Sequence, residues 1–131
     1  MVAALPTSHA ATNRKKVDLA TLKNDPFLLF PRAIGPMLYD RIIGACRKAG
    51  FEPMIGQLVP QFASIINLVA AELGVAIVPA SMSQLLIAGV AYRQIAGQAP
   101  SAKLALAHRR AETSATVRNF LARVHSTASV S

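Results

Sequence analysis

The sequence predicts a single α/β domain in which a mostly parallel sheet carries helices on its faces. Short apolar segments with strand character alternate with segments of helical periodicity, at a spacing typical of this class. The chain has 131 residues, of which 53% are hydrophobic, enough for one core and too few for two. In such folds ligands bind at the carboxyl ends of the parallel strands, so a site is expected there.

The first expected element is an extended segment at Val2–Pro6. A polar loop with turn-forming and basic residues follows at Thr7–Lys16. Asp18 can then cap a single helical turn that runs through Leu22.

A buried strand is predicted at Phe27–Phe30, because this continuous apolar run lies between two prolines and needs cover on both faces. The next helix begins at Pro36 and stops at Gly50. Its apolar stripe consists of Leu38, Ile42, Ala45, Cys46 and Ala49.

A second strand–helix–strand unit follows, with strands at Pro53–Val59 and Val75–Val78. The helix between them starts at Phe62, and we expect Gly74 to end it in a left-handed conformation. Its buried stripe is predicted as Phe62, Ile65, Ile66, Val69 and Leu73.

The remaining segments predict a short helix closed by Gly89, an extended segment at Val90–Ile95, a strand at Lys103–His108 and a final helix. The short helix should turn Met82, Leu85 and Leu86 inward, and the final helix has an apolar face of Val117, Phe120, Leu121 and Val124. A lone strand and helix need a partner, so these last elements and the Val2 strand look like parts of a second subdomain whose remainder is absent.

The charge balance favours acidic partners, since 14 basic and 6 acidic side chains give a net charge of +8. Nucleic acid is the first such partner to consider. The basic residues, however, form separate short clusters at Arg14-Lys15-Lys16, Arg47-Lys48 and Arg109-Arg110, and the chain has no Trp to stack on bases. A solvated basic face is therefore the preferred interpretation, and direct DNA contact the weaker one.

Catalytic and metal chemistry find no support in the sequence. The single cysteine, Cys46, lies on an apolar helix stripe and is interpreted as a small buried hydrophobe. His9, His108 and His125 are scattered, without the spacing of a triad or metal site. We therefore expect no enzyme activity, no cofactor and no metal, and the absence of a signal-peptide pattern predicts a cytoplasmic location.

Two strand ends are candidates for a binding cleft: Phe30-Pro31-Arg32 and Val59-Pro60-Gln61. After the first of them, a turn at Gly35-Pro36 opens a helix whose free backbone N–H groups point back over the end of the strand. Such an arrangement suits an anion.

Several segments together resemble the C-terminal part of the effector-binding domain of LysR-type transcriptional regulators. No single segment is diagnostic, but their order and spacing cover the chain from about Val2 to Val124. They are Leu5-Pro-Thr-Ser-His9, Asp18-Leu-Ala-Thr-Leu22, Asp25-Pro-Phe-Leu-Leu-Phe-Pro-Arg32, Gly35-Pro-Met-Leu-Tyr-Asp40, Ala49-Gly-Phe-Glu-Pro53 and Leu68-Val-Ala-Ala-Glu-Leu-Gly-Val-Ala-Ile-Val-Pro-Ala80.

The resemblance implies a fold like that of type 2 periplasmic solute-binding proteins, with two α/β subdomains, two crossover strands and a small effector in the cleft between them. About 7–95 would be the second subdomain, while 1–6 and 96–125 would be the crossovers and a remnant of the first. The winged helix-turn-helix, the linker helix and most of the first subdomain are missing, so DNA would be bound only through a domain absent from this chain.

The resemblance also implies the effector contacts of the second subdomain, which are Pro31, Arg32, Gly35, Pro36, Met37, Leu38, Pro60 and Gln61. The backbone N–H groups of Met37 and Leu38 would favour a carboxylate, and their side chains could pack on an apolar or aromatic body. The alternative is that the prolines only shape a turn and that Arg32 is a solvated surface charge.

The implied function is sensing of a small organic acid or aromatic carboxylate, relayed to DNA binding through a change in subdomain or subunit angle. With the first subdomain largely missing, the isolated chain should bind effector weakly or not at all, and the apolar face of its last helix should promote self-association. A fragment of a periplasmic-type solute receptor remains the alternative, although the sequence shows neither a signal peptide nor a disulfide pair.

Overall fold

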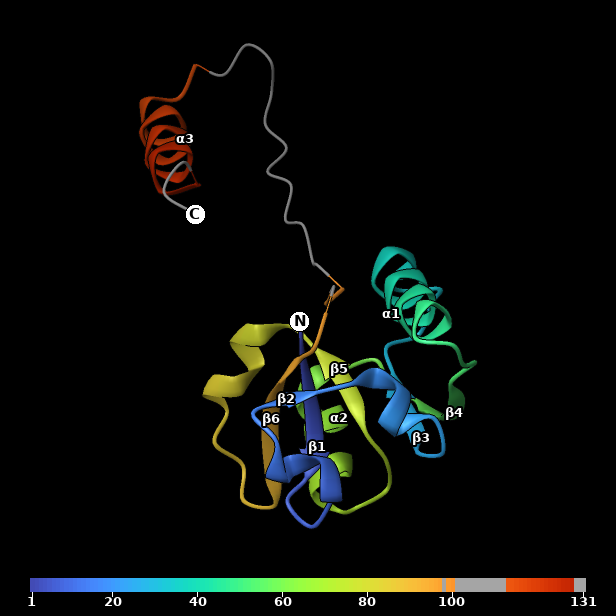
Figure 1. Cartoon of the computed structure of the whole chain (residues 1–131). Coiled ribbons are helices and arrows are strands. Elements are labelled where there is room, and N and C mark those ends of the chain that lie inside the picture. The colour runs from blue at the N-terminus through green and yellow to red at the C-terminus, as the bar shows by residue number, and fades with distance from the viewer. Residues whose placement is uncertain (98, 101–112, 129–131) are drawn as a thin grey trace.

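The computed structural model describes residues 1–97, 99–100 and 113–128 (Figure 1). Its strands are β1 (Val2–Pro6), β2 (Lys16–Val17), β3 (Pro26–Leu29), β4 (Met54–Leu58), β5 (Ala76–Val78) and β6 (Val90–Ile95). Its α-helices are α1 (Pro36–Lys48), α2 (Phe62–Ala70) and α3 (Ala115–Ala128), and its 3-10 helices are η1 (Ala10–Asn13), η2 (Leu19–Leu22) and η3 (Ala80–Gln84).

The described strands form one nearly continuous layer. A four-stranded sheet has the order β2-β6-β1-β5, and β3-β4 form a parallel pair beside it. The two parts join where the Val75 carbonyl accepts from Leu28 N–H at 2.8 Å and Val75 N–H donates to the Pro26 carbonyl at 2.9 Å. Of the described strands only β1 opposes the others, because it pairs antiparallel with both β5 and β6. The prediction of a mostly parallel sheet is confirmed, with β1 as its exception.

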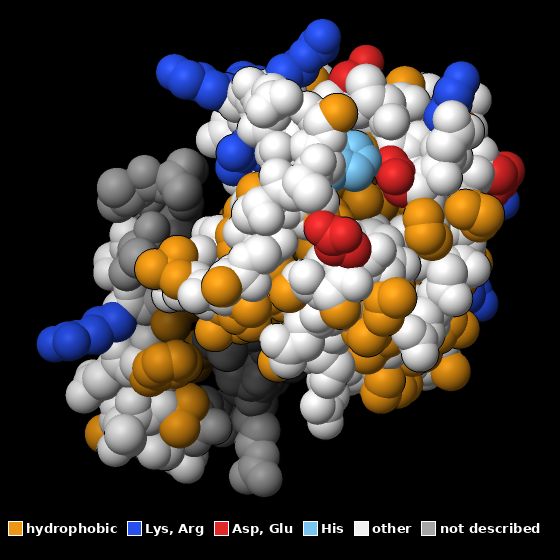
Figure 2. Space-filling view, turned by 90° about the horizontal axis from the view of Figure 1, so that it is seen from below, with side chains coloured by type: hydrophobic (Ala, Val, Ile, Leu, Met, Phe, Trp, Pro, Cys, Tyr) orange, Lys and Arg blue, Asp and Glu red, His pale blue; other side chains and the backbone are white. Residues whose placement is uncertain are grey.

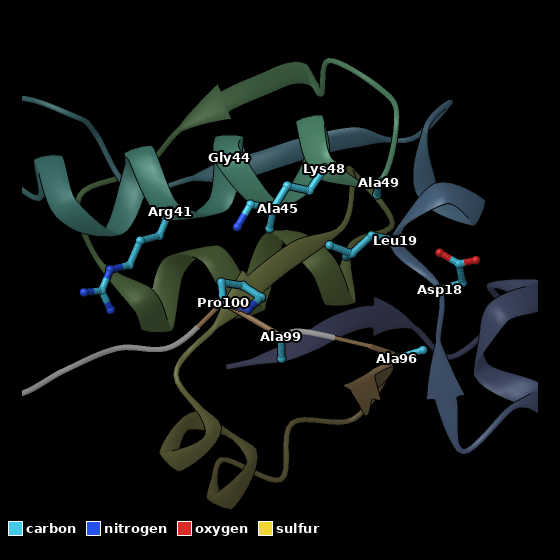
Figure 3. Close-up of a pocket in the computed structure, with 10 residues that line it drawn as sticks. All are labelled: Asp18, Leu19, Arg41, Gly44, Ala45, Lys48, Ala49, Ala96, Ala99 and Pro100. Carbon is cyan, nitrogen blue, oxygen red and sulfur yellow. The ribbon is translucent and has the colours of Figure 1, made fainter.

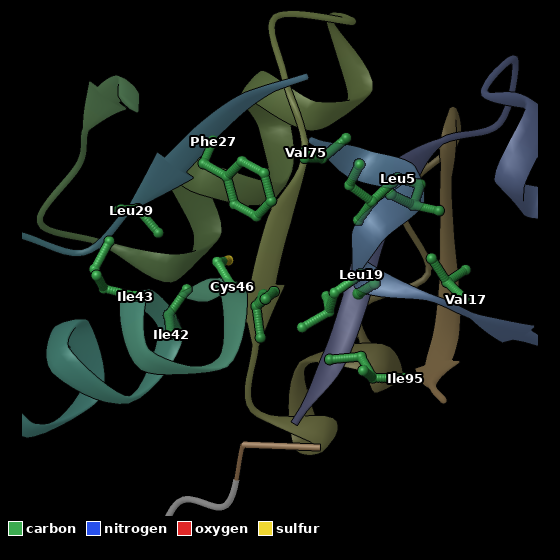
Figure 4. Packing of buried hydrophobic residues seen from close by; sticks show 13 residues of the cluster. Leu5, Val17, Leu19, Phe27, Leu29, Ile42, Ile43, Cys46, Val75 and Ile95 are labelled. Carbon is green, nitrogen blue, oxygen red and sulfur yellow. The ribbon is translucent and has the colours of Figure 1, made fainter. Parts of the chain in front are cut away.

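Two hydrophobic clusters lie on opposite faces of this layer. On β3, Phe27 and Leu29 belong to the cluster under α1, whereas Leu28 belongs to the cluster under α2. Figure 4 shows the first cluster, in which Ile42, Ile43 and Cys46 of α1 face the sheet. Since side chains alternate along a strand, this split confirms that the apolar run of β3 is buried on both faces.

The helix ends agree with the sequence at α1 and differ at α2. Gly50, after α1, has the left-handed φ of +91° that was expected of a terminating glycine. The helix α2, however, stops at Ala70, and Glu72 takes the left-handed conformation with φ of 62°, so the role predicted for Gly74 is wrong. Leu73 is consequently outside the helix and 55% exposed, not part of the buried stripe.

Gly74 has a different requirement, because a Cβ at this position would lie 2.4 Å from the carbonyl oxygen of Pro26. The chain entering β5 passes so close to the start of β3 that no side chain fits there. Close approach, and not the backbone angle, makes glycine necessary.

Three further sequence expectations are corrected. Leu86 is 91% exposed and Leu85 38% exposed, because the chain leaves helical geometry after Gln84 and only Met82 packs on the core. The short strand β2 lies at the end of the segment predicted as loop. The third strand is shifted by one residue and spans Pro26–Leu29.

The strand β4 is an outer strand, paired only with β3 in the described part of the chain. All five of its residues are exposed, among them Met54 at 52% and Leu58 at 50%. It therefore leaves an uncharged, partly apolar edge of the sheet open to solvent.

The C-terminal helix α3 is present as predicted, whereas the strand expected at Lys103–His108 lies outside the described residues. On its apolar face Leu121 is buried and Phe120 is 57% exposed. No described residue of α3 joins either core cluster, and Figure 1 draws this helix apart from the sheet. The structure does not contain, within its described residues, a helix long and apolar enough to cross a membrane.

Candidate functional site

The carboxyl ends of β3 and β4 lie side by side, and a short connection leads from each of them into a helix, α1 after β3 and α2 after β4. Their parallel pairing continues past the strands, since Val59 N–H donates to the Leu29 carbonyl at 2.8 Å. Residues 30–35 then lead from β3 into α1, and residues 59–61 lead from β4 into α2. Two segments that are far apart in the sequence are therefore neighbours at one end of the sheet.

An aromatic contact joins these two connections. The ring of Phe30, just after β3, stacks on that of Phe62, the first residue of α2, with centroids 5.2 Å apart and planes inclined by 21°. A Cβ at Gly35 would lie only 3.0 Å from Cδ1 of Phe30, so the turn before α1 rests against the same ring. The sequence placed Phe30 at a candidate strand end of the cleft but did not predict this aromatic contact.

Both helices start without a side-chain cap. Gly35 is the N-cap of α1 and Gln61 that of α2, and neither supplies a side-chain hydrogen bond. The carbonyls of these residues accept the first helical bonds, from Tyr39 N–H at 3.0 Å and Ile65 N–H at 3.1 Å. The amino ends of two helix dipoles thus face the same end of the sheet, which favours a negatively charged group.

Arg32 lies at this end in an ion pair that the sequence did not reveal. Its Nε and one terminal nitrogen donate to the two carboxylate oxygens of Asp40, at 2.8 and 3.0 Å. The hydrogen bonds to the guanidinium lower the pKa of Asp40, and the same bonds raise the pKa of Arg32. Both side chains are largely exposed, so the pair orients Arg32 more than it stabilises the fold.

The eight predicted site residues gather around these two turns, with differing exposure. Met37 is 65% exposed, and Leu38 is partly buried against the cluster under α1. Of the others, Pro31 and Gly35 are partly buried, while Arg32, Pro36, Pro60 and Gln61 are exposed. Ile34, 60% exposed in the same turn, is an apolar neighbour that sequence reasoning missed.

The candidate reactive groups have structural roles. Cys46 is fully buried, as predicted, and burial raises the pKa of its thiol to about 11, with a smaller effect of the Glu52 charge. His9 accepts from Ala11 N–H through Nδ1 and contacts Asp25 through Nε2 at 3.0 Å. Among the described residues, no cluster of three or more His, Cys, Asp or Glu side chains is placed to hold a metal ion.

The match to a known family decides what this fold is. A model of the LysR substrate binding domain covers residues 1–129. The chain belongs to that family. This LysR-type domain is 33% identical over 121 residues to the HTH-type transcriptional regulator BudR of Raoultella terrigena, which covers 92% of this chain and 42% of BudR. It is also 35% identical over 126 residues to the uncharacterized HTH-type transcriptional regulator YnfL of Escherichia coli, which covers 95% of this chain and 42% of YnfL.

Solved structures agree with this assignment. The LysR-type domain matches the effector binding domain of BenM with its effector benzoate, at a TM-score of 0.66 and 25% identity, over 73% of this chain and 44% of that one. It matches CbnR, a LysR family transcriptional regulator, at a TM-score of 0.66 and 30% identity, over 76% of this chain and 34% of that one. The periplasmic-binding-protein-like type 2 fold expected from the resemblance is therefore confirmed.

The relatives also fix the class of protein. Those of the LysR-type domain are transcriptional regulators and not enzymes, as the sequence predicted. The chain spans only about 42% of the length of BudR and YnfL.

Proposed function

We propose that this LysR-type domain senses a small organic acid or aromatic carboxylate at the turns that follow β3 and β4. The effector would lie over the Phe30–Phe62 stack, with its carboxylate toward the uncapped starts of α1 and α2. In the proposal, Pro31, Gly35 and Pro36 shape one wall, and Met37 and Leu38 pack on the effector body. Pro60 and Gln61 form the opposite wall.

The observation that carries this proposal is the convergence of two helix amino ends on one aromatic floor. The helix dipoles provide anion selectivity, and the two rings provide an apolar contact surface next to it. The BenM effector binding domain, which this chain resembles, has benzoate as its effector, and benzoate combines a carboxylate with an aromatic body. The ion pair with Asp40 holds Arg32 beside the site, although the Asp40 carboxylate cancels its charge at long range.

Thermal unfolding in the presence of a panel of aliphatic and aromatic carboxylates tests the proposal. We expect an effector to raise the melting temperature, and Met37→Glu to abolish that rise, because a carboxylate at position 37 repels the bound anion. Met37 is 65% exposed, so the substitution should leave the fold intact. Met54→Glu, at a similarly exposed residue of β4, is the matched control and should keep the rise.

A melting rise that survives in Met37→Glu would move the effector away from the α1 start. If a folded sample shows no rise with any acid, then this half of the cleft is insufficient. The decisive contacts would in that case belong to the first subdomain. In the proposed division of the chain, about 7–95 is the second subdomain, and only 1–6 and 96–125 supply the crossovers and a remnant of the first.

We further propose that effector binding is relayed to DNA through parts of the regulator that this chain does not contain. The relatives of this domain are named HTH-type regulators, and full-length CbnR has been solved with its target DNA. In the full regulator, an effector bound more tightly by one arrangement of subdomains or subunits would shift the population toward it. Such a regulator would act in the cytoplasm.

Self-association is part of the same proposal. The exposed ring of Phe120 on α3 and the open edge of β4 are two apolar surfaces that a second copy could cover. Light scattering should find species larger than a monomer, and Phe120→Ser should reduce their fraction. A monodisperse monomer with an ordered α3 would contradict this expectation.

A further inference from the structure

A second concave site lies along α1, away from the proposed effector turns. The pocket has a volume of about 500 Å³, within the range of small-molecule sites. It is bounded by α1 on one side and by the segments that follow β2 and β6 on the other, so it too opens at the carboxyl end of the sheet (Figure 3). None of the eight residues predicted for the effector lines it.

The pocket has an excess of positive charge. Arg41 and Lys48, two helical turns apart, both leave α1 on the side that faces Ala99 and Pro100 (Figure 3). Asp18 is the only acidic residue among the described lining residues, and it lies at the far end of the pocket, where it caps η2 through a 3.0 Å bond from Ala20 N–H. An anion placed between Arg41 and Lys48 would meet complementary charge.

Gly44 forms part of the pocket between these two cations. A Cβ at this position would meet no atom within 4 Å, and its φ is not in the left-handed range. Glycine is unfavourable inside a helix compared with alanine, yet neither packing nor backbone conformation within the described structure requires it here. The open space over Gly44 is part of the same pocket and leaves room for a ligand against this face of α1.

The walls supply apolar contacts. Leu19 is 5% exposed and Pro100 is buried, and both line the pocket. Ala45 and Ala49 add small side chains along α1, which keep the pocket wide. A ligand with a short carbon chain between two charged groups matches this combination of apolar walls and separated cations.

We propose that this pocket binds a small dicarboxylate, with its charged groups toward Arg41 and Lys48 and its carbon chain over Gly44. The site does not rest on the effector proposal, because Gly44 lies seven residues, or about 10 Å along the helix axis, from Met37. A bound dicarboxylate would join α1 to the segment after β6.

Titration of the full chain with glutarate, followed by ¹H–¹⁵N NMR, tests the two sites separately. We expect saturable shifts of the Gly44, Ala45 and Lys48 amides, and much weaker shifts with acetate. Gly44→Leu should fill the pocket and remove the shifts of Ala45 and Lys48. Lys48→Gln should weaken binding about fivefold or more, and Lys23→Gln, at an exposed lysine away from the pocket, should change it little.

Four outcomes would overturn the proposal. They are the absence of saturable shifts up to about 20 mM glutarate, unchanged binding in a folded Gly44→Leu, equal weakening by Lys48→Gln and Lys23→Gln, and shifts confined to Met37 and Leu38. The last outcome would instead support the effector turns. If Gly44→Leu fails to fold, the comparison of Lys48→Gln with Lys23→Gln still tests whether glutarate binds in this pocket.

Discussion

The two ends of the sheet are built differently. At the amino end of the parallel strands, loops that are distant in sequence are tied together by side chains: Ser8 donates to Glu72 at 2.6 Å, and His9 contacts Asp25 at 3.0 Å. Thr7 N–H also donates to the Gly89 carbonyl at 3.0 Å. Figure 2, which looks at the molecule from below, shows a histidine among acidic side chains.

At the carboxyl end, the connections make few such ties. The start of α1 has no side-chain cap, the Arg32–Asp40 pair stays within one connection and its helix, and the pocket along α1 is open. One end of the sheet is therefore cross-linked by its own side chains around a small pocket of about 230 Å³, while the other leaves polar backbone and the larger pocket along α1 for a ligand. Stability is expected to reside at the first end and binding at the second.

The largest effect that tests this comparison involves two glycines. Gly74→Ala should destabilise the fold by about 3 kcal/mol, because the new Cβ would lie 2.4 Å from the Pro26 carbonyl oxygen at the closed end. Gly44→Ala at the open pocket should stabilise it by up to about 1 kcal/mol through helix propensity. Urea unfolding measures the change in unfolding free energy for each variant, and similar changes at the two positions would contradict the proposed difference between the two ends.

The core between the two ends excludes water, and the pH dependence of the unfolding free energy should reveal this. Burial raises the pKa of the Cys46 thiol from 9.0 to about 11, so the thiolate forms first in the unfolded chain. The protonated, buried thiol therefore makes its full contribution to stability below pH 9. As the pH rises to about 11, the unfolding free energy should fall by roughly 2 to 3 kcal/mol.

The measurement is the difference in unfolding free energy between the natural chain and Cys46→Ala, taken from pH 8 to pH 11. The natural chain should be the more stable at pH 8, since the substitution leaves a cavity, and the difference should shrink as the pH rises. A constant difference would mean that the thiol is already open to solvent in the folded state.

The smallest effect concerns the tie between His9 and Asp25. Both side chains are mostly buried, at 19% and 27% exposure, so Asp25→Ala should cost about 1 to 2 kcal/mol. Asn24→Ala, at the exposed neighbour, should change stability by less than about 0.5 kcal/mol. A double-mutant cycle with His9→Ala isolates the contact, and simple additivity would argue that it stabilises nothing.

The open end was the easier one to foresee from the sequence. Residues of β3 and α1 show strong local patterns: an apolar run between prolines, and a helical stripe that starts at Pro36 and stops at Gly50. Such signals depend on neighbouring residues alone, so they survive in any tertiary context.

The closed end depends on contacts that no local pattern encodes. The glycine at position 74 was interpreted as a helix terminator, whereas its requirement comes from Pro26, a residue 48 positions earlier in the chain. Leu86 looked like part of a buried helix face and is 91% exposed, because η3 had already ended. At the open end, too, contacts that no local pattern encodes were missed, namely the pairing of Arg32 with Asp40 and the Phe30–Phe62 stack.

The antiparallel strand β1 also sets the order in which the molecule can be assembled. It lies between β5 and β6, and Val2 pairs with both Val78 and Gln94. Among the described strands β1 comes before β5 and β6 in the chain, so its hydrogen bonds on both sides form only after both later strands are present. Such distant pairing is slow because a long loop must close first. Until then β1 lacks partners for its hydrogen bonds, and apolar residues left exposed at that stage favour aggregation.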